Sequence, residues 1–104
     1  MRRARVDIYR AIADPTRRAI LDRLRAGAAP VHELAADFDQ TRPAISKHLR
    51  VLRRVRLVTE RRLGRERVYR LDPAPLQRVA GWLEGYRSFW ASSLSNLKRY
   101  LERT

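Results

Sequence analysis

The sequence contains no cysteine, so disulfide bonds and thiolate-bound metal sites are excluded. Histidine is also scarce, because His32 and His48 are the only two in the chain. No apolar run approaches the roughly 20 residues that a membrane-spanning helix needs, and the basic residues 1–5 precede no apolar signal segment. We therefore expect a cytoplasmic protein with no membrane partner.

Acidic residues are few as well: 11 against 24 basic residues, which leaves a net charge of +13. All but two of the basic residues are arginines, the exceptions being Lys47 and Lys98. Such a balance favours a polyanionic partner, nucleic acid before an anionic membrane. Arginine suits phosphates and guanine edges, although a merely solvated arginine-rich surface would have the same composition.

The chain has 104 residues, which predicts one domain over residues 1–104. A chain this short buries a limited fraction of its surface, so a partner subunit would help to stabilise it. The first helix is predicted over residues 6–12. Asp14 is a good N-cap and Pro15 suits the first helical position, so a second helix starts there and stops near Gly27.

A third helix is predicted over residues 31–38 and a fourth over residues 44–53, where Thr41 caps and Pro43 is tolerated in the first turn. The fourth helix presents Ile45, Leu49 and Leu52 on one inner face.

Residues 57–63 and 67–71 favour β-strands, and the short turn Gly64-Arg65 joins them. A long last helix is predicted over residues 74–101, because apolar residues recur every three or four positions. The expected fold class is therefore mainly α with a β-hairpin (α+β): a winged helix-turn-helix of about five helices plus a two-stranded wing. Residues 6–73 form the core and residues 74–101 the C-terminal helix.

The third and fourth helices, with their tight connection and the basic second member, describe a helix-turn-helix that binds double-stranded DNA. In this interpretation Arg42 reads guanine, Ser46 and Thr41 contact phosphate or bases, and Ala44 lets the backbone approach the duplex. The alternative is an exposed polar helix face, and His48 has a second alternative, a hydrogen bond within the protein. The predicted DNA-binding residues of this segment are Thr41, Arg42, Pro43, Ala44, Ser46, Lys47, His48 and Arg50.

Arginines surround the tip of the predicted hairpin: Arg61, Arg62, Arg65 and Arg67. A basic β-ribbon that follows a recognition helix fits a wing that grips phosphates or the minor groove. The alternative is a solvated hairpin whose charge discourages aggregation.

Three segments in order, residues 13–21, 42–52 and 64–71, resemble the ArsR/SmtB family of winged-helix repressors, and the resemblance covers roughly residues 6–101. It implies a homodimer joined through the first and last helices, which include Ile8 and Tyr9. It also implies an inverted-repeat operator and repression of the downstream operon. Arg42, Ser46 and Lys47, together with His48, match the positions where the family's recognition helix meets DNA.

The sequence departs from the family in its missing metal ligands. Metal sensors of the family carry a cysteine pair on the third helix, or histidine and acidic ligands on the last helix. Here the third helix has no cysteine and the last has no histidine. We therefore expect no metal, no cofactor and no response to metals through the usual sites, with His32 a surface residue.

Arg56 is a second departure, because relatives often carry glycine just after the recognition helix. Either Arg56 adopts a positive φ or the helix ends in another way.

The last helix carries most of the aromatic residues, and its near-heptad stripe is too long to be buried against so small a domain. A symmetry mate is the simplest partner. A ligand pocket between helices and an amphipathic membrane helix are the alternatives. The predicted interface on this helix comprises Leu83, Tyr86, Trp90, Leu94, Leu97 and Leu101.

The preferred function is a homodimeric, sequence-specific transcriptional repressor. Two alternatives stay open: a regulator gated by a small organic molecule or partner protein at the last helix, and a nonspecific architectural or RNA-binding protein. An enzyme is not expected, because the sequence offers no nucleophile–base pair, metal cluster or glycine-rich phosphate loop.

Overall fold

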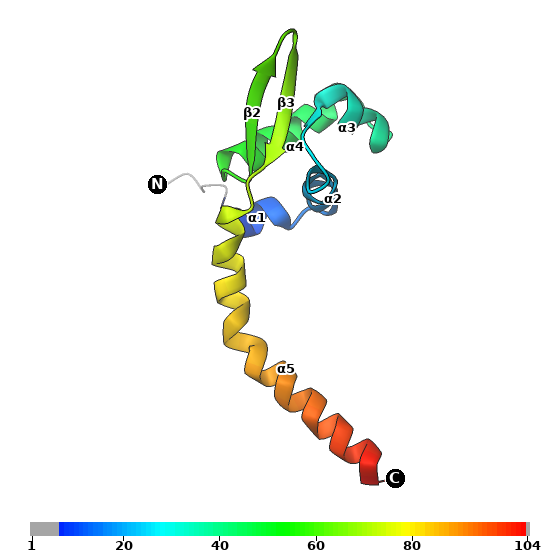
Figure 1. The fold of residues 1–104 in the computed structure, drawn as a ribbon, viewed down its shortest axis with the longest axis vertical. Coiled ribbons are helices and arrows are strands. Elements are labelled where there is room, and N and C mark those ends of the chain that lie inside the picture. The colour runs from blue at the N-terminus through cyan, green and yellow to red at the C-terminus, as the bar shows by residue number, and fades with distance from the viewer. Residues whose placement is uncertain (1–6, 104) are drawn as a thin grey trace, which may run out of the picture.

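The computed structural model describes residues 7–103, and over that range four helices precede a β-hairpin and a fifth follows it. The four helices are α1 (Ile8–Ile12), α2 (Pro15–Leu24), α3 (Val31–Asp37) and α4 (Arg42–Arg54), and the last is α5 (Gln77–Arg103). The predicted class, mainly α with a β wing, is confirmed (Figure 1). Val6, predicted to open the first helix, lies outside the described residues.

The corner between α1 and α2 is held by capping contacts from both sides. Asp14 caps α2 as predicted, since its Oδ2 accepts the backbone N–H of Arg17 at 2.9 Å. The Arg17 Nε in turn donates to the Ala11 carbonyl at 2.7 Å, and Arg18 Nη1 donates to the Ile12 carbonyl at 2.8 Å. Two arginines of α2 therefore satisfy carbonyls that the short α1 leaves free at its end.

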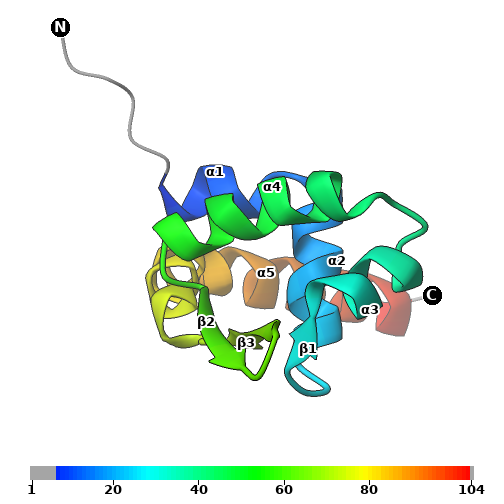
Figure 2. The ribbon, with the colours of Figure 1, turned by 90° about the horizontal axis from the view of Figure 1, so that it is seen from above.

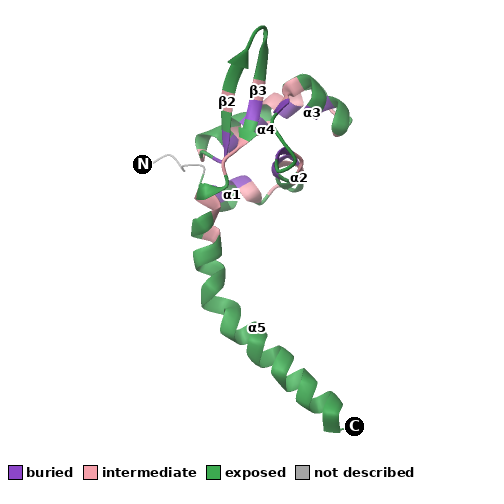
Figure 3. Ribbon diagram, in the orientation of Figure 1, coloured by how far each residue is buried: buried purple, intermediate pink, exposed green. Residues whose placement is uncertain are grey.

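The core lies between the four helices α1 to α4, residue Ala29 and the end of the hairpin nearest the helices (Figure 3). The predicted inner face of α4 is confirmed, because its three apolar residues are each 0% exposed. The largest fully buried side chains are Ile20, Leu34, Ile45, Leu49, Leu52 and Leu57.

Strands β2 (Val58–Leu63) and β3 (Glu66–Leu71) form the predicted antiparallel hairpin, whose turn contains Gly64 at φ 62°. The expectation of a two-stranded wing is incomplete, because β1 (Ala29–Pro30) adds to the free edge of β3 in the order β1-β3-β2 (Figure 2). A two-residue strand has no periodicity to detect. Only its pairing with a distant segment defines it.

Helix α4 ends with Arg56 in the left-handed region at φ 63°, which decides the question that the missing glycine raised. The Leu57 N–H bonds to the Leu52 carbonyl and the Arg56 N–H to the Arg53 carbonyl, both at 3.0 Å. This is the Schellman pattern, which normally places glycine where Arg56 stands. The same pattern ends α3, with Asp39 at φ 51°.

The last helix starts later than predicted, because residues Ala74–Leu76 form a 3₁₀ turn (η1) before α5 begins at Gln77. Asp72 Oδ1 accepts the Ala74 N–H at 3.1 Å and the Leu76 N–H bonds to the Pro73 carbonyl at 2.9 Å. These contacts tighten the first turn.

Helix α5 leaves the domain at the end opposite the hairpin tip, and none of its residues is buried (Figures 1 and 3). The radius of gyration is 18.6 Å, well above the roughly 13 Å of a compact domain of this size. Within residues 7–103, no helix combines the length and apolarity needed to cross a membrane.

Two neighbouring residues of α1 have different surroundings. Ile8 is 3% exposed and packs in the core of its own protomer, so it offers almost no surface to the dimer interface in which it was predicted. Tyr9 is 42% exposed, and its ring lies edge-on to Trp82 with centroids 6.0 Å apart. The Tyr9 hydroxyl also donates to the Arg78 carbonyl at 3.3 Å, so α1 fixes the direction in which α5 starts.

Candidate nucleic-acid interface

Helices α3 and α4 form a helix-turn-helix that α2 supports from behind. The Arg23 guanidinium of α2 lies 2.8 Å from an Asp37 carboxylate oxygen and 3.6 Å from one of Glu33, both on α3. Leu34 and Ile45 pack in the common core. The α3–α4 angle therefore depends on buried apolar contacts, with an exposed ion-pair network that adds little.

The N-terminal half of α4 presents its polar side chains to solvent. Thr41 caps the helix as predicted, because its Oγ1 accepts the Ala44 N–H at 3.3 Å. Since Ile45 and Leu49 point inward, Arg42, Pro43, Lys47 and Arg50 are exposed, while Ala44 and Ser46 are half-buried.

His48 turns toward the protein. Its side chain is 22% exposed, and its Nδ1 lies 3.9 Å from Asp14 Oδ2 at the start of α2. The hydrogen bond from the Arg17 backbone N–H is the main cause that lowers the pKa of Asp14; burial opposes it, and the charges of Arg17 and His48 lower it further. His48 therefore faces its own protein, but at 3.9 Å this contact is too long for the hydrogen bond that the second alternative expected.

The register of the hairpin separates the predicted wing arginines. Glu60 pairs with Tyr69, and Arg62 pairs with Arg67, so these four side chains share one face of the ribbon. Arg61 pairs with Val68 on the opposite face. Arg65 lies in the turn at the tip.

Glu60 joins the wing to the recognition helix. One of its carboxylate oxygens lies 2.7 Å from Arg53 Nη1 of α4 and accepts the Tyr69 hydroxyl at 3.3 Å, and the other lies 3.4 Å from Arg67 Nε. The Glu60 side chain is 17% exposed. Burial, followed by the charge and hydrogen bond of Glu60, raises the pKa of Tyr69. A negative charge thus lies inside a positive surface and neutralises part of it.

A hollow of about 520 Å³ lies between the starts of α3 and α4 and the tip of the wing. It brings together four predicted site residues, two from α4 and two from the wing: Arg42, Ser46, Arg65 and Arg67. His32 and Glu66 complete its rim, with His32 Nδ1 3.6 Å from Glu66 Oε1. The fold therefore assembles positive groups that are more than 20 positions apart in the chain.

Other predicted residues lie elsewhere. Arg61 faces a different hollow on the far side of the hairpin, and His48 faces α2. The sequence analysis did not identify Glu60 as a site residue. Its place on the same strand face as Arg62 could have been predicted from their two-residue spacing. Its contact with Arg53 could not, because Arg53 lies on α4.

No group of three histidine, cysteine or acidic side chains capable of holding a metal ion occurs within the described part of the chain. The two histidines lie beside different carboxylates, those of Glu66 and Asp14.

Comparison with known proteins matches a helix-turn-helix domain model to residues 12–61. The chain is 43% identical over 94 residues to the HTH-type transcriptional regulator Rv2034 of Mycobacterium tuberculosis, covering 90% of this chain and 85% of that protein. It is 35% identical to the transcriptional repressor SdpR of Bacillus subtilis, covering 74% of this chain and 86% of that protein.

Solved structures that resemble this chain are also helix-turn-helix transcriptional regulators. The ArsR family transcriptional regulator RHA00566 superposes with a TM-score of 0.71 at 38% identity, covering 81% of this chain and 92% of that one. The homodimeric winged helix-turn-helix DNA-binding domain Mb0332 of Mycobacterium bovis superposes with a TM-score of 0.63 at 26% identity, covering 77% and 74%.

Proposed function

The chain belongs to the ArsR family of winged helix-turn-helix transcriptional regulators, and we propose that it is a cytoplasmic homodimeric repressor that binds an inverted repeat in double-stranded DNA. The observation that carries this proposal is the hollow shared by Arg42 and Ser46 of α4 with Arg65 and Arg67 of the wing. Groups from a helix start and a β-ribbon there converge on one surface, as contact with a groove and its flanking phosphates requires.

Each part of this surface has its own role. Arg42 stands at the first position of α4 and reads a guanine edge by a bidentate contact. Ser46 contacts the neighbouring base or phosphate. The Thr41 hydroxyl accepts from the backbone, so its proton stays available for a phosphate oxygen. Lys47 and Arg50 reach the phosphates that flank the groove, and Pro43 and Ala44 let the helix start approach the duplex.

The wing supplies the second set of contacts. Arg62, Arg65 and Arg67 lie on the face or at the tip that is turned toward α4. We assign them to phosphates or to the adjacent minor groove. Arg61 faces the other way and receives a separate assignment below.

Dimerisation occurs in this proposal through α5, with Tyr9 of α1 beside it. The apolar stripe of α5 is exposed throughout, and Mb0332, a relative of the same fold, is a homodimer. A symmetric dimer formed through α5 presents one α4 helix from each protomer to the two half-sites of the operator, about 34 Å apart. The exposed residues of the stripe are Leu83, Tyr86, Trp90, Leu94, Leu97 and Leu101.

The regulator does not respond to metals through the family's usual sites in this proposal, because the ligand residues are missing from α3 and α5. The aromatic row formed by Tyr9, Trp82, Tyr86 and Phe89 favours a second candidate, a regulator gated by an organic ligand or partner protein on α5.

A gel-shift titration against the DNA upstream of the protein's own gene, with scrambled competitor and at two salt concentrations, tests the proposal. Binding that survives the competitor, with two protomers per site, is the expected result. Equal affinity for operator and scrambled duplexes, erased by salt, would instead support a nonspecific architectural role driven by the net charge of +13.

A further inference from the structure

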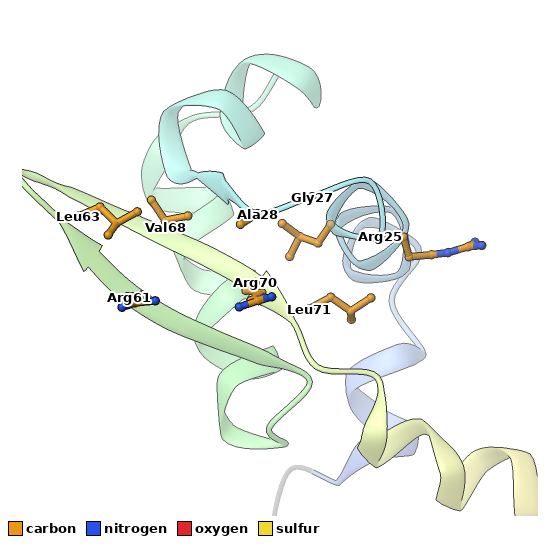
Figure 4. Close-up of a pocket in the computed structure, with 9 residues that line it drawn as sticks. Arg25, Gly27, Ala28, Arg61, Leu63, Val68, Arg70 and Leu71 are labelled. Carbon is orange, nitrogen blue, oxygen red and sulfur yellow. The ribbon is translucent and has the colours of Figure 1, made fainter.

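The face of the hairpin that points away from α4 has a composition unlike that of the DNA-facing side. A hollow of about 470 Å³ lies between this face, the end of α2 and the loop before β1 (Figure 4). That volume is within the usual range of small-molecule sites. Its lining residues are Leu24, Arg25, Gly27, Ala28, Arg61, Leu63, Val68, Arg70 and Leu71.

Part of the lining of this hollow is apolar, and we call Leu24, Leu63, Val68 and Leu71 its apolar wall. Leu24 is 3% exposed, while Val68 and Leu71 are half-buried. Leu63 is 55% exposed although it lies in a strand. An exposed leucine beside further apolar side chains is a surface that a hydrocarbon chain covers favourably.

Two positively charged side chains, Arg61 and Arg70, line the same hollow without a negatively charged partner. Arg61 is opposite Val68 and Arg70 is opposite Thr59 in the register, so the two arginines are diagonal neighbours on one face. Within residues 7–103 neither guanidinium has a hydrogen bond or ion pair, and no acidic residue lines the hollow. By contrast, the hollow beside α4 contains Glu66, and a smaller one beside α1 and α2 contains Asp22.

The other charged residues near the hollow, Arg25 and Glu66, do not neutralise Arg61 and Arg70. Figure 4 shows the Arg25 side chain pointing away from the hairpin, where Asp22 lies 4.0 Å from it. Glu66 is on the same face as Leu63, but its carboxylate is directed to His32 on α3. The electrostatic potential inside the hollow is therefore positive, and its sources are Arg61 and Arg70.

We propose that this hollow binds an amphipathic organic anion, a single-chain carboxylate whose head lies between Arg61 and Arg70 and whose hydrocarbon chain covers Leu63 and Val68. Guanidinium groups bind carboxylates through charge-assisted hydrogen bonds, and the apolar wall rejects a purely polar anion. The site is separate from the DNA-reading surface. A ligand there would contact the wing directly, and this consequence for DNA binding rests on the proposed function.

The test measures binding of sodium decanoate to the full chain without DNA, by isothermal titration calorimetry together with amide shift mapping by NMR. Saturable binding is expected, with shifts concentrated at residues 61–70. The double variant Arg61→Gln/Arg70→Gln is expected to bind at least about tenfold more weakly, the scale of losing charged hydrogen bonds. The matched control, Arg62→Gln/Arg65→Gln, removes the same charge from the other face and the tip, and is expected to bind as the parent does.

Three outcomes would overturn the proposal. Equal weakening in both double variants would mean attraction by overall charge. If decanol bound as tightly as decanoate, the arginines would have no role in binding. If acetate bound as tightly, the apolar wall would have none. Shifts centred on α5, with a change in Trp82 and Trp90 fluorescence, would place the anion on the aromatic row. Because DNA is absent from every arm, the result is independent of whether the operator proposal holds.

Discussion

Arg53 on α4 and Glu60 on β2 form an ion pair with an N–O distance of 2.7 Å, which connects the recognition helix to the wing. Arg67 and the buried Tyr69 meet the same carboxylate. Since the Glu60 side chain is only 17% exposed, this contact is screened less than the surface pairs of α2 and α3. Glu60 therefore helps the shared apolar core to hold helix and wing in their relative position, on which the simultaneous DNA contact proposed above depends.

Replacement of Glu60 by glutamine is expected to lower the free energy of unfolding by about 1–2 kcal/mol, because three donors lose a charged acceptor. The added positive charge raises nonspecific DNA affinity, whereas the loosened wing lowers specific affinity. The ratio of operator to scrambled affinity, measured by gel shift, should therefore fall. Glu84→Gln makes the same charge change on α5, where Glu84 lies beside Arg87, and should leave the ratio unchanged; an equal fall in both variants would exclude a positioning role for Glu60.

Arg42→Ala is expected to weaken operator binding by about 1–3 kcal/mol, the scale of one bidentate base contact, and Ser46→Ala by about 1 kcal/mol. Scrambled DNA should be affected less, because base contacts carry the specificity. Footprinting or fluorescence anisotropy checks both variants. Arg99→Ala removes an equal charge from exposed α5 and serves as control. Unchanged footprints in both α4 variants would contradict the assigned reading face.

Trp90→Glu is expected to give a monomer, because it places a charge at the centre of the exposed apolar stripe of α5. Operator affinity should then drop at least about tenfold, as loss of an interface hot spot predicts. Sedimentation velocity measures the association state. Ser92→Glu introduces the same charge on the opposite side of the helix and should remain dimeric. If both variants were monomeric, or both dimeric, the apolar stripe of α5 would not be the dimer interface.

The stability of the protein should depend on acid pH through Asp14, whose pKa the Arg17 N–H lowers in the folded state. A lowered folded pKa means that the ionised carboxylate stabilises the fold above the unfolded value of about 3.9, and that this stabilisation is lost as pH falls through the folded pKa.

Asp14→Asn keeps the capping acceptor and removes the charge. We expect it to be about 0.3–1 kcal/mol less stable at pH 7, with the difference in urea unfolding shrinking as pH falls below the unfolded value and through the lower folded pKa. Asp22→Asn, an exposed change in the same helix, should differ little from the parent at neutral pH. A gap for Asp14→Asn that does not shrink at all as pH falls from 7 through the acid range would show that its charge is not the cause.

Arg56→Gly is expected to raise the free energy of unfolding by about 1 kcal/mol, because glycine adopts the left-handed C′ conformation without the Cβ clash that Arg56 tolerates. Arg54→Gly removes the same charge from the last turn of α4 and should destabilise by about 1 kcal/mol, since that position is helical. Chemical denaturation distinguishes the two signs. Destabilisation by both would indicate that the Arg56 side chain makes a contribution larger than its strain.

Local signals in the sequence determined most of the fold. Asp14 and Thr41 were identified as helix caps because an N-cap needs only its own side chain and the N–H three residues on. The inner face of α4 followed from the helical period of its apolar residues, and the hairpin followed from two β-favouring runs joined by a short turn with Gly64. The net charge and the order of motifs predicted a DNA-binding regulator before any contact was known.

Tertiary structure decided what depends on distant partners. Strand β1 exists only because β3 lies beside it. Glu60 contacts α4 only because the fold places the Arg53 guanidinium 2.7 Å from its carboxylate. Ile8, predicted at the dimer interface, is instead buried in the core of its own protomer. Likewise, the sequence predicted one group of four arginines from their positions around the hairpin turn, and the strand register placed Arg61 on the face opposite to Arg62 and Arg67. Charge and propensity are properties of single residues, whereas pairing, burial and facing direction arise from the packing of elements that are remote in the chain.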